Sequence, residues 1–357
     1  MKKQVKISVI LFLILFTTFT IPTEIYSCST FCIKDSNKVI FGYNFDWYEV
    51  NGIIIVNKRN VSKVAYMPWD DKPVSWLSKF GSITFTAFGK ELPFGGMNEA
   101  GLVVAQMWLN DTKYPEIDNR QALSELQWIQ YQLDNSETID DVIASDKEVR
   151  ITKYTLAPLH FLVSDRSGNV VTIEFLKGRL VYHAGDELPV SLLTNTKYDK
   201  LLKNLIEFMD FGEKDANPTS KSRFIKGTYM IKKYQENSEK PIVDYAFDML
   251  DFVKQGHTRW SIVFDANNLQ IYYKTFRNQD IKKIKLSDFN FNCNAEDSLL
   301  DVDKKFNKVP DDFEKYTTEK NRNLIFYNSK LHEGFNNIPN EFWEQMAKYP
   351  ESLECRK

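Results

Sequence analysis

The sequence has no excess of basic residues. Its 46 lysines and arginines are matched by 48 aspartates and glutamates, which gives a formal net charge of −2. Proteins that bind nucleic acids or anionic membranes through charge carry basic patches, and this composition does not favour such patches. We therefore expect no nucleic-acid partner. A hydrophobic content of 43%, with 14% aromatic residues, instead predicts a globular protein with a large core.

Histidine and cysteine are scarce, with four of each. The cysteines Cys28, Cys32, Cys293 and Cys355 form no CxxC pair and have no histidine at the spacing of a zinc site. No glycine-rich phosphate loop follows a predicted strand, so the sequence predicts neither a metal nor a cofactor. In an exported protein, a Cys293–Cys355 disulfide would leave the first two cysteines free. Buried thiols at Cys32 and Cys293 are the simpler alternative.

The sequence also lacks an apolar run long enough for a comfortable membrane span. The run at residues 7–19 follows three lysines and precedes a short polar stretch, which is the pattern of a secretory signal peptide. Ser27 is the small residue that a signal peptidase needs before its cut. We expect cleavage to leave Cys28 as the first residue of a periplasmic or secreted protein. The alternative is a lipoprotein box at residues 25–28, with Cys28 lipidated, although Tyr26 is bulky for that motif.

Strand and helix patterns alternate in blocks along the rest of the chain. The predicted strands are residues 30–33, 38–44, 52–57, 82–88, 102–108, 160–164, 170–175, 179–183, 191–194, 259–265 and 269–275, and the predicted helices are residues 121–133, 136–144, 198–208, 220–235 and 241–253. Blocks of antiparallel strands and helices indicate a layered α+β fold. We expect a signal peptide at residues 1–27, one domain at 28–295 and a mostly helical extension at 296–357.

A cysteine at the front of a mature chain has its own α-amino group beside its thiol. The ordinary pKa of that amine is about 7.7–8.0, so near neutral pH part of it is a free base that can take the thiol proton. Cys28 would then be nucleophile and general base together, which suits acyl transfer from an amide or ester. Such a site also needs donors for the oxyanion and a carboxylate that orients the amine.

Several short segments that begin at this cysteine match, in order, the motifs of one enzyme family. They are Cys28-Ser29-Thr30-Phe31, Phe41-Gly42-Tyr43-Asn44-Phe45-Asp46-Trp47, Gly96-Met97-Asn98-Glu99-Ala100-Gly101-Leu102, Leu193-Thr194-Asn195, Ser222-Arg223-Phe224 and Thr258-Arg259-Trp260-Ser261. Over about residues 28–290 the chain resembles the choloylglycine hydrolase and penicillin V acylase family. These enzymes are linear amide C–N hydrolases of the N-terminal nucleophile hydrolase superfamily.

The resemblance implies a four-layer αββα sandwich, with two antiparallel sheets between helical layers. It also implies an exported hydrolase without a cofactor that cleaves the amide bond of an N-acylated small molecule. Conjugated bile salts, penicillin V and acyl-homoserine lactones are the substrate classes that it suggests. An oligomer of identical chains is a further expectation.

The resemblance assigns roles to individual residues. Cys28 would be the nucleophile and, through its amine, the base, and Asp46 would bind that amine. Asn195 and the backbone around Asn98 would donate hydrogen bonds to the oxyanion. Arg223 would support the site electrostatically.

Tyr43 departs from the family pattern, which has an arginine at this position, close to the nucleophilic sulfur. A guanidinium there would favour the thiolate, and tyrosine cannot supply that charge. Either Arg223 or another basic residue compensates, or the activity is weaker, or the substrate class differs.

The sequence leaves plainer interpretations of these residues open. Asp46 could shape a turn, Asn98 could belong to a hairpin turn, Asn195 could cap the next helix, and Arg223 could form a surface ion pair.

Two rival functions also stay open. A papain-like hydrolase would pair Cys28 or Cys32 with His257. A lipid-anchored binding protein on the same fold would have lost catalysis.

Overall fold

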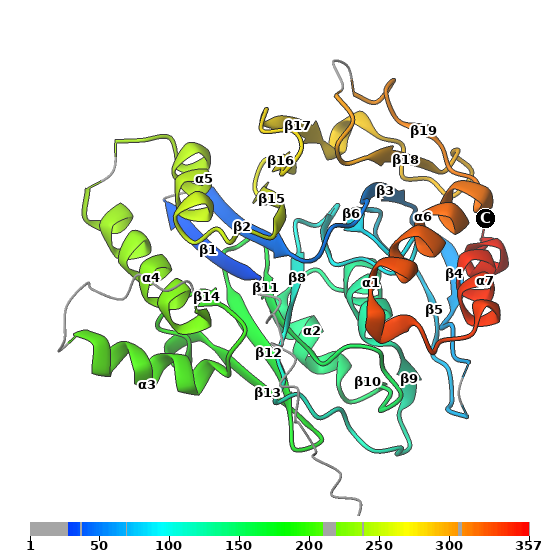
Figure 1. Ribbon diagram of the computed structural model, residues 1–357, viewed down its shortest axis with the longest axis horizontal. Helices are drawn as coiled ribbons and strands as arrows, with labels where there is room; N and C mark the ends of the chain where they lie inside the picture. The colour runs from blue at the N-terminus through cyan, green and yellow to red at the C-terminus, as the bar shows by residue number, and fades with distance from the viewer. Residues whose placement is uncertain are drawn as a thin grey trace, which may run out of the picture.

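Two antiparallel sheets dominate the computed structural model, which describes residues 28–35, 38–68, 70–209, 219–237, 239–305 and 309–356 (Figure 1). The expected signal peptide, residues 1–27, lies outside the described residues. The first sheet has six strands in the order β14 (Leu192–Leu193), β1 (Ser29–Asp35), β2 (Lys38–Asp46), β15 (Thr258–Asp265), β16 (Gln270–Thr275) and β17 (Lys282–Lys285).

The second sheet has nine strands and packs against the first. Their order is β13 (Arg179–Ala184), β12 (Val170–Leu176), β11 (Leu159–Ser164), β8 (Val103–Trp108), β7 (Gly95–Asn98), β6 (Ser82–Thr86), β3 (Ile53–Asn57), β18 (Ser298–Asp301) and β19 (Glu314–Lys315). Phe85 of this sheet contacts Phe264 and Tyr273 of the first, with ring centroids 6.4 and 5.3 Å apart. The main hydrophobic core therefore lies between the two sheets.

Helices cover the outer faces of both sheets. They are α1 (Glu125–Asn135), α2 (Ile139–Ser145), α3 (Tyr198–Met209), α4 (Ser220–Asn237), α5 (Ile242–Phe252), α6 (Thr318–Leu331) and α7 (Asn340–Lys348). In Figure 1, α4 and α5 lie beside β1 and β2, while α1 packs on β7 and β8 of the other sheet. Strands such as β3 and β6 are consequently buried on both faces. This arrangement confirms the predicted αββα sandwich.

The first predicted helix begins later than its apolar pattern indicates. Residues 121–123 form a short strand, β9 (Gln121–Leu123), which pairs in parallel with β10 (Val149–Ile151). Ser124 then caps α1 by accepting a hydrogen bond from the Gln127 N–H. A side-chain acceptor at this position satisfies a backbone donor that has no partner within the helix. The prediction that the helix begins at residue 121 was therefore wrong, because residues 121–123 form a strand and the helix begins at Glu125.

Residues 296–357 contribute strands as well as helices. Strand β18 pairs with β3, and β19 pairs with β18, so this segment completes the nine-stranded sheet instead of forming an appendage. Further along, β20 (Glu354–Cys355) pairs with β4 (Val61–Val64), which also pairs with β5 (Ser75–Leu77). Helices α6 and α7 lie between these strands in the sequence and pack on each other.

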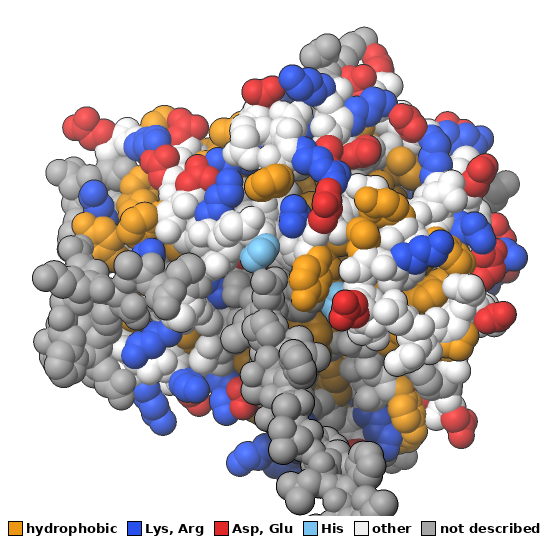
Figure 2. All heavy atoms as spheres, in the orientation of Figure 1, with side chains coloured by type: hydrophobic (Ala, Val, Ile, Leu, Met, Phe, Trp, Pro, Cys, Tyr) orange, Lys and Arg blue, Asp and Glu red, His pale blue; other side chains and the backbone are white. Residues whose placement is uncertain are grey.

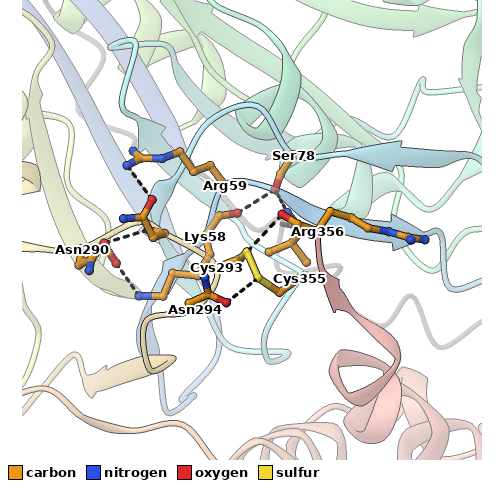
Figure 3. Close-up of a disulfide and its surroundings, with 10 residues drawn as sticks. Lys58, Arg59, Ser78, Asn290, Cys293, Asn294, Cys355 and Arg356 are labelled. Atoms are coloured by element: carbon orange, nitrogen blue, oxygen red, sulfur yellow. Dashed lines mark hydrogen bonds between the residues drawn. A yellow bond between two sulfur atoms is a disulfide. The ribbon is translucent and has the colours of Figure 1, made fainter.

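A disulfide joins Cys293 to Cys355, which is one of the two alternatives that the sequence left open (Figure 3). The two cysteines are 62 positions apart, and the loop that they close contains α6 and α7. Next to the bridge, the Arg356 N–H donates to the Asn60 carbonyl. The bridge therefore joins β20, the edge strand of the three-stranded sheet, to the segment that precedes β18.

Acidic and basic side chains are interspersed over the face of the molecule in Figure 2. This distribution agrees with the near-neutral composition, because neither sign dominates that face. Within the residues that the structure describes, no helix is long and apolar enough to cross a membrane.

Removal of the disulfide should lower stability. We expect Cys355→Ser to lower the free energy of unfolding by about 2–4 kcal/mol, because the open chain regains the entropy of a long loop. Chemical denaturation with and without dithiothreitol measures the effect. Reductant should destabilise the wild type and leave Cys355→Ser unchanged, and equal stabilities of the two oxidised proteins would contradict the prediction.

Candidate active site

The ends of three neighbouring strands bring the predicted site residues together. Cys28 immediately precedes β1, Asp46 ends β2, and Thr258 begins β15. The pairing of β1 with β2 places Ser29 opposite Asn44, and the pairing of β2 with β15 places Asp46 opposite Thr258. Antiparallel pairing therefore gathers a cysteine, a carboxylate and a hydroxyl at one edge of the six-stranded sheet.

The glycine of the FGYNFDW segment has a specific packing role near this edge. Phe31 of β1 lies opposite Gly42 of β2. A Cβ atom at position 42 would come within 2.2 Å of the Phe31 ring, so only glycine allows this close approach. The ring thereby packs over β2 and helps to set the register that brings Cys28 towards Asp46.

Cys28 is buried, with 2% of its surface exposed, and its Sγ atom lies 3.9 Å from the Asp46 carbonyl oxygen. Burial raises the pKa of the Cys28 thiol to about 12, and the Asp46 charge acts in the same direction. Arg223 and Tyr43 oppose this change. In the chain as described, the residue 28 nitrogen is a peptide nitrogen, because residue 27 precedes it. The thiol is therefore neutral in this form of the protein.

Asp46 is a buried carboxylate, and only one of its two oxygens accepts a hydrogen bond from a described residue. The Thr258 hydroxyl donates to Oδ1, whereas Oδ2 is buried and has no hydrogen-bond partner among the described residues. Burial raises the Asp46 pKa to about 6, and the nearby Arg223 charge limits the rise. A buried carboxylate oxygen without a donor is costly, so this position suits a donor that the described chain does not supply.

Arg223 links the cysteine to Asn195. It lies in the first turn of α4, and its Nη1 donates to the Cys28 carbonyl at 2.5 Å and to Ser29 Oγ at 2.6 Å. Its Nη2 donates to Asn195 Oδ1 at 3.0 Å. Burial lowers the Arg223 pKa to about 10, so the guanidinium stays charged near neutral pH. The side chain is 1% exposed, which rules out the surface ion pair that the sequence left open.

Asn195 follows β14, the neighbour of β1, and its side chain points into the cluster. Its Nδ2 donates to the Trp108 carbonyl at 2.9 Å, and its Oδ1 accepts from Arg223. Since the oxygen is committed to Arg223, Asn195 does not cap α3. A side-chain amide has two N–H groups, and among the described residues only one of them has an acceptor.

Tyr43 lies between the cysteine and the second sheet. Its hydroxyl is near enough to the Cys28 thiol and the Gln106 side chain for both to affect its pKa. Among the described residues it forms no hydrogen bond of standard geometry. Burial and Cys28 raise the pKa of Tyr43 well above its ordinary value, so the hydroxyl is neutral. Tyr43 therefore offers a neutral O–H to the sulfur in the position where the family has a charged group.

Asn98 serves a turn and not the cluster. Its Oδ1 accepts from the N–H groups of Ala100 and Leu102, and its Nδ2 donates to the carbonyls of Leu133 and Ser136. The backbone N–H groups from residue 98 to residue 102 all have acceptors within the turn or in Gly81. The backbone around Asn98 is therefore not available as an oxyanion donor. The plainer interpretation, a hairpin turn, is the correct one.

Three contacts of the cluster were not predicted from the sequence. Thr258 bonds Asp46, Ser29 accepts from Arg223, and the Trp108 carbonyl holds Asn195. Thr258 and Ser29 both fall inside motif segments, so their positions at strand ends were a usable signal. Trp108 had no such signal, because its contact with Asn195 joins residues that are 87 positions apart.

An apolar cavity of about 290 Å³ adjoins the cluster. Trp47, Gln106 and Trp108 line it on the side of the cluster. Trp47 directly follows Asp46, Gln106 lies beside the Tyr43 hydroxyl, and Trp108 bonds Asn195. The cavity thus lies against residues that adjoin or contact Asp46, Tyr43 and Asn195.

The cysteine–histidine pair of the rival hydrolase finds no support. His257 is exposed, whereas Cys28 and Cys32 are both buried. Cys32 lies beside Ser164 and Asp165 of the second sheet, and burial raises its pKa to about 12. The described residues contain no group of three or more His, Cys, Asp or Glu side chains that could hold a metal ion.

Two stacked antiparallel sheets between helical layers, with a cysteine at the start of the first strand, define the fold of the N-terminal nucleophile hydrolases. The chain belongs to the linear amide C–N hydrolases, choloylglycine hydrolase family, whose model matches residues 28–298. Enzymes of this family are amidases and acylases that hydrolyse linear amide bonds.

Individual relatives agree with this assignment. The chain is 26% identical over 260 residues to a penicillin V acylase of Pectobacterium atrosepticum, covering 61% of this chain and 69% of that protein. The structure of penicillin V acylase from Agrobacterium tumefaciens has a TM-score of 0.70 at 21% identity, covering 82% of this chain and 98% of that one. A mutant conjugated bile acid hydrolase from Clostridium perfringens has a TM-score of 0.65 at 19% identity, covering 78% and 97%. At these identities the two structures establish the fold alone.

Tyr43→Phe tests the contact between the hydroxyl and the thiol. We expect it to move the pH dependence of Cys28 alkylation to higher pH, because the hydroxyl lowers the pKa of this thiol. Iodoacetamide labelling of the purified protein, read by mass spectrometry at the Cys28 peptide, measures the shift.

The matched control is Tyr273→Phe, which removes another buried hydroxyl from a strand of the same sheet. It should leave the labelling profile unchanged. Equal profiles for Tyr43→Phe and the wild type would show that the Tyr43 hydroxyl does not act on the sulfur.

Proposed function

We propose that the protein is an exported hydrolase that cleaves the amide bond of an N-acylated small molecule, with Cys28 as its N-terminal nucleophile. Three features support this proposal: the family of the chain, a signal-like segment that ends directly before Cys28, and the contacts of Asp46. The observation that carries it is the Asp46 Oδ2, which is buried beside Cys28 and has no hydrogen-bond partner in the described part of the chain.

Cleavage before Cys28 would create the donor that this oxygen lacks. The peptide nitrogen of residue 28 would become an α-amino group, which is cationic or neutral around its ordinary pKa of about 7.7–8.0. An ammonium beside Asp46 would stabilise the ionised carboxylate and would itself be held in place. Cleavage would thus complete the hydrogen bonding of Asp46 and provide a base next to the thiol.

The reaction would then proceed through a thioester. The α-amine takes the thiol proton while Sγ bonds to the amide carbon, and the carbonyl oxygen becomes an oxyanion. The uncommitted N–H of Asn195 is placed to donate to that oxyanion. The C–N bond breaks as the α-ammonium gives its proton to the leaving amine. Water then attacks the thioester, again losing a proton to the α-amine, and releases the carboxylic acid and the thiol.

Arg223 and Tyr43 would stabilise the attacking sulfur from two sides. Arg223 lowers the pKa of the Cys28 thiol by its charge, and the neighbouring Tyr43 hydroxyl lowers it as well. The guanidinium also fixes the Cys28 carbonyl and the Asn195 amide relative to each other. Arg223 thereby compensates in part for the arginine that the family has at position 43.

The relatives suggest the chemical class of the substrate. Two of them are penicillin V acylases and one is a conjugated bile acid hydrolase, all of which act on an acyl group joined to an amine. We extend this to the present chain as N-acyl amides of the penicillin V, bile-salt or acyl-homoserine-lactone type. The apolar cavity beside Trp47 would receive the acyl group.

Replacement of the cysteine tests the nucleophile. We expect Cys28→Ala to reduce hydrolysis of N-acyl amides to the background rate while the circular dichroism spectrum and melting temperature stay native. Cys32→Ala is the control, because this thiol lies against Ser164 and not in the cluster. Full activity in Cys28→Ala would refute the assignment.

The free α-amine can be tested separately from the thiol. Two proteins that lack residues 1–27 should be compared, one that begins at Cys28 and one with a single glycine ahead of it. The glycine converts the amine into an amide that cannot accept a proton. We expect at least about a 100-fold lower kcat, the usual contribution of a general base. Equal kcat values would show that another group is the base.

A further inference from the structure

One wall of the apolar cavity comes from residues 332–346, beyond the end of the family match at residue 298. We call His332, Phe335, Phe342, Trp343 and Met346, which line the cavity, the C-terminal wall. His332 and Phe335 lie at η3 (Glu333–Phe335), and the other three belong to α7. Since residues 28–298 supply the cluster, a single cavity is shared by two separate parts of the chain.

The C-terminal wall is joined directly to the residues beside the cysteine. The His332 ring stacks on Trp47, with centroids 5.6 Å apart and planes 29° apart. It also stacks on Phe335 at 4.5 Å. Because Trp47 follows Asp46 in the sequence, this stack runs from the wall to within one residue of the carboxylate. The C-terminal wall therefore contacts a residue that adjoins the cluster.

Buried contacts hold the C-terminal wall in place. Asn328 of α6 donates to the carbonyls of Asn51 and Ala87 at 2.9 and 2.6 Å. Asn321 donates to the Ala347 carbonyl of α7 and accepts from the Lys90 N–H. The Cys293–Cys355 disulfide closes the loop that contains both helices. The wall is thus formed before a ligand arrives, which reduces the entropy that binding would cost.

The lining determines the charge of the occupant. Besides the aromatic and aliphatic side chains it includes Glu125, which accepts from the N–H groups of Leu156 and Ala157 at 3.1 and 3.0 Å. An anionic group in the cavity would lie beside this carboxyl with no lysine or arginine among the lining residues to offset it, and burial lowers the pKa of the lining His332. The cavity therefore suits a neutral apolar group.

The size of the cavity limits the occupant as well. A cavity of roughly 150 Å³ holds benzene. The 290 Å³ here is about twice that volume, which corresponds to roughly a dozen non-hydrogen atoms. An aryl-substituted acetyl group or a medium-length alkyl acyl group fits this volume. The tetracyclic acyl group of a bile salt is far larger.

We propose that the C-terminal wall makes this enzyme selective for neutral arylacetyl or medium-chain acyl groups over steroid acyl groups. The inference rests on the proposed amide hydrolysis and names the acyl half of its substrate. It follows from the shared cavity, its place beside residues that adjoin the cluster, its apolar lining without lysine or arginine, and its volume.

A series of amides with one common amine tests the selectivity. The acyl groups are acetyl, phenoxyacetyl, octanoyl and cholyl, and kcat/KM is measured for each with the mature protein. We expect phenoxyacetyl and octanoyl amides to exceed both the acetyl and the cholyl amides. Phe335→Ala should lower the phenoxyacetyl-to-acetyl ratio by roughly 10- to 100-fold, the effect of losing one buried aromatic contact surface.

The ratio does not depend on how much of each preparation is folded. Phe252→Ala, which removes an exposed phenylalanine outside the cavity, should leave the ratio unchanged. A cholyl amide hydrolysed as well as the phenoxyacetyl amide, or an unchanged ratio in Phe335→Ala, would overturn the inference and leave the amidase function intact.

A binding measurement separates this inference from the proposed function. Phenoxyacetamide is titrated into Cys28→Ala and into Cys28→Ala/Phe335→Ala, with tryptophan fluorescence as the signal, because three tryptophans line the cavity. Tighter binding to the first protein supports the C-terminal wall even if no amide is hydrolysed by the wild type. Equal binding to both proteins overturns it.

Discussion

The buried carboxylate of Asp46 is the constraint on which the rest of the site depends. One of its oxygens is bonded to Thr258, and the other is buried beside Cys28 without a partner among the described residues. Burial alone would strongly favour the neutral acid, and the Arg223 charge is what limits the rise in the Asp46 pKa. Removing either charge would leave the other buried and uncompensated. The ends of three strands and the first turn of α4 thus bring Cys28, Asp46 and Arg223 close enough for the two charged side chains to affect each other's pKa and that of the thiol.

Much of this arrangement could be predicted from the sequence. The layered fold followed from blocks of strands and helices, and the motif resemblance named Cys28, Asp46, Asn195 and Arg223, which the structure brings into one cluster. These residues lie at or near strand or helix ends, where a short sequence motif is a good guide to the position of a side chain. Asn98 was placed wrongly, because a motif match does not show which groups are already hydrogen-bonded in a turn. The C-terminal wall escaped prediction, because it depends on packing between residues almost 300 positions apart.

Two features set this chain apart from the family pattern: Tyr43 stands where the motif has an arginine, and the C-terminal wall lies beyond the family match at residue 298. A neutral hydroxyl beside the sulfur replaces a charge, so Arg223 alone supplies positive charge to the thiol among the groups that affect its pKa. The tyrosine also packs where the second sheet comes close, since a Cβ at Gly95 would lie 3.3 Å from its ring. Gln106, which lies beside the Tyr43 hydroxyl, also lines the cavity to which the C-terminal wall belongs. In the proposed mechanism, activation of the sulfur and selection of the acyl group would therefore depend on neighbouring side chains.

The central claim is that Cys28 becomes the free first residue and that its amine serves Asp46. An N-terminal cysteine reacts with 2-cyanobenzothiazole to form a stable ring that requires both its amine and its thiol, whereas internal or lipidated cysteines do not. The most direct measurement is the intact mass of active, exported protein before and after this labelling under denaturing conditions. The prediction is a chain of residues 28–357 that gains one label at Cys28. Full amidase activity in a protein that retains residues before Cys28, or carries a blocked Cys28 amine, would contradict the claim.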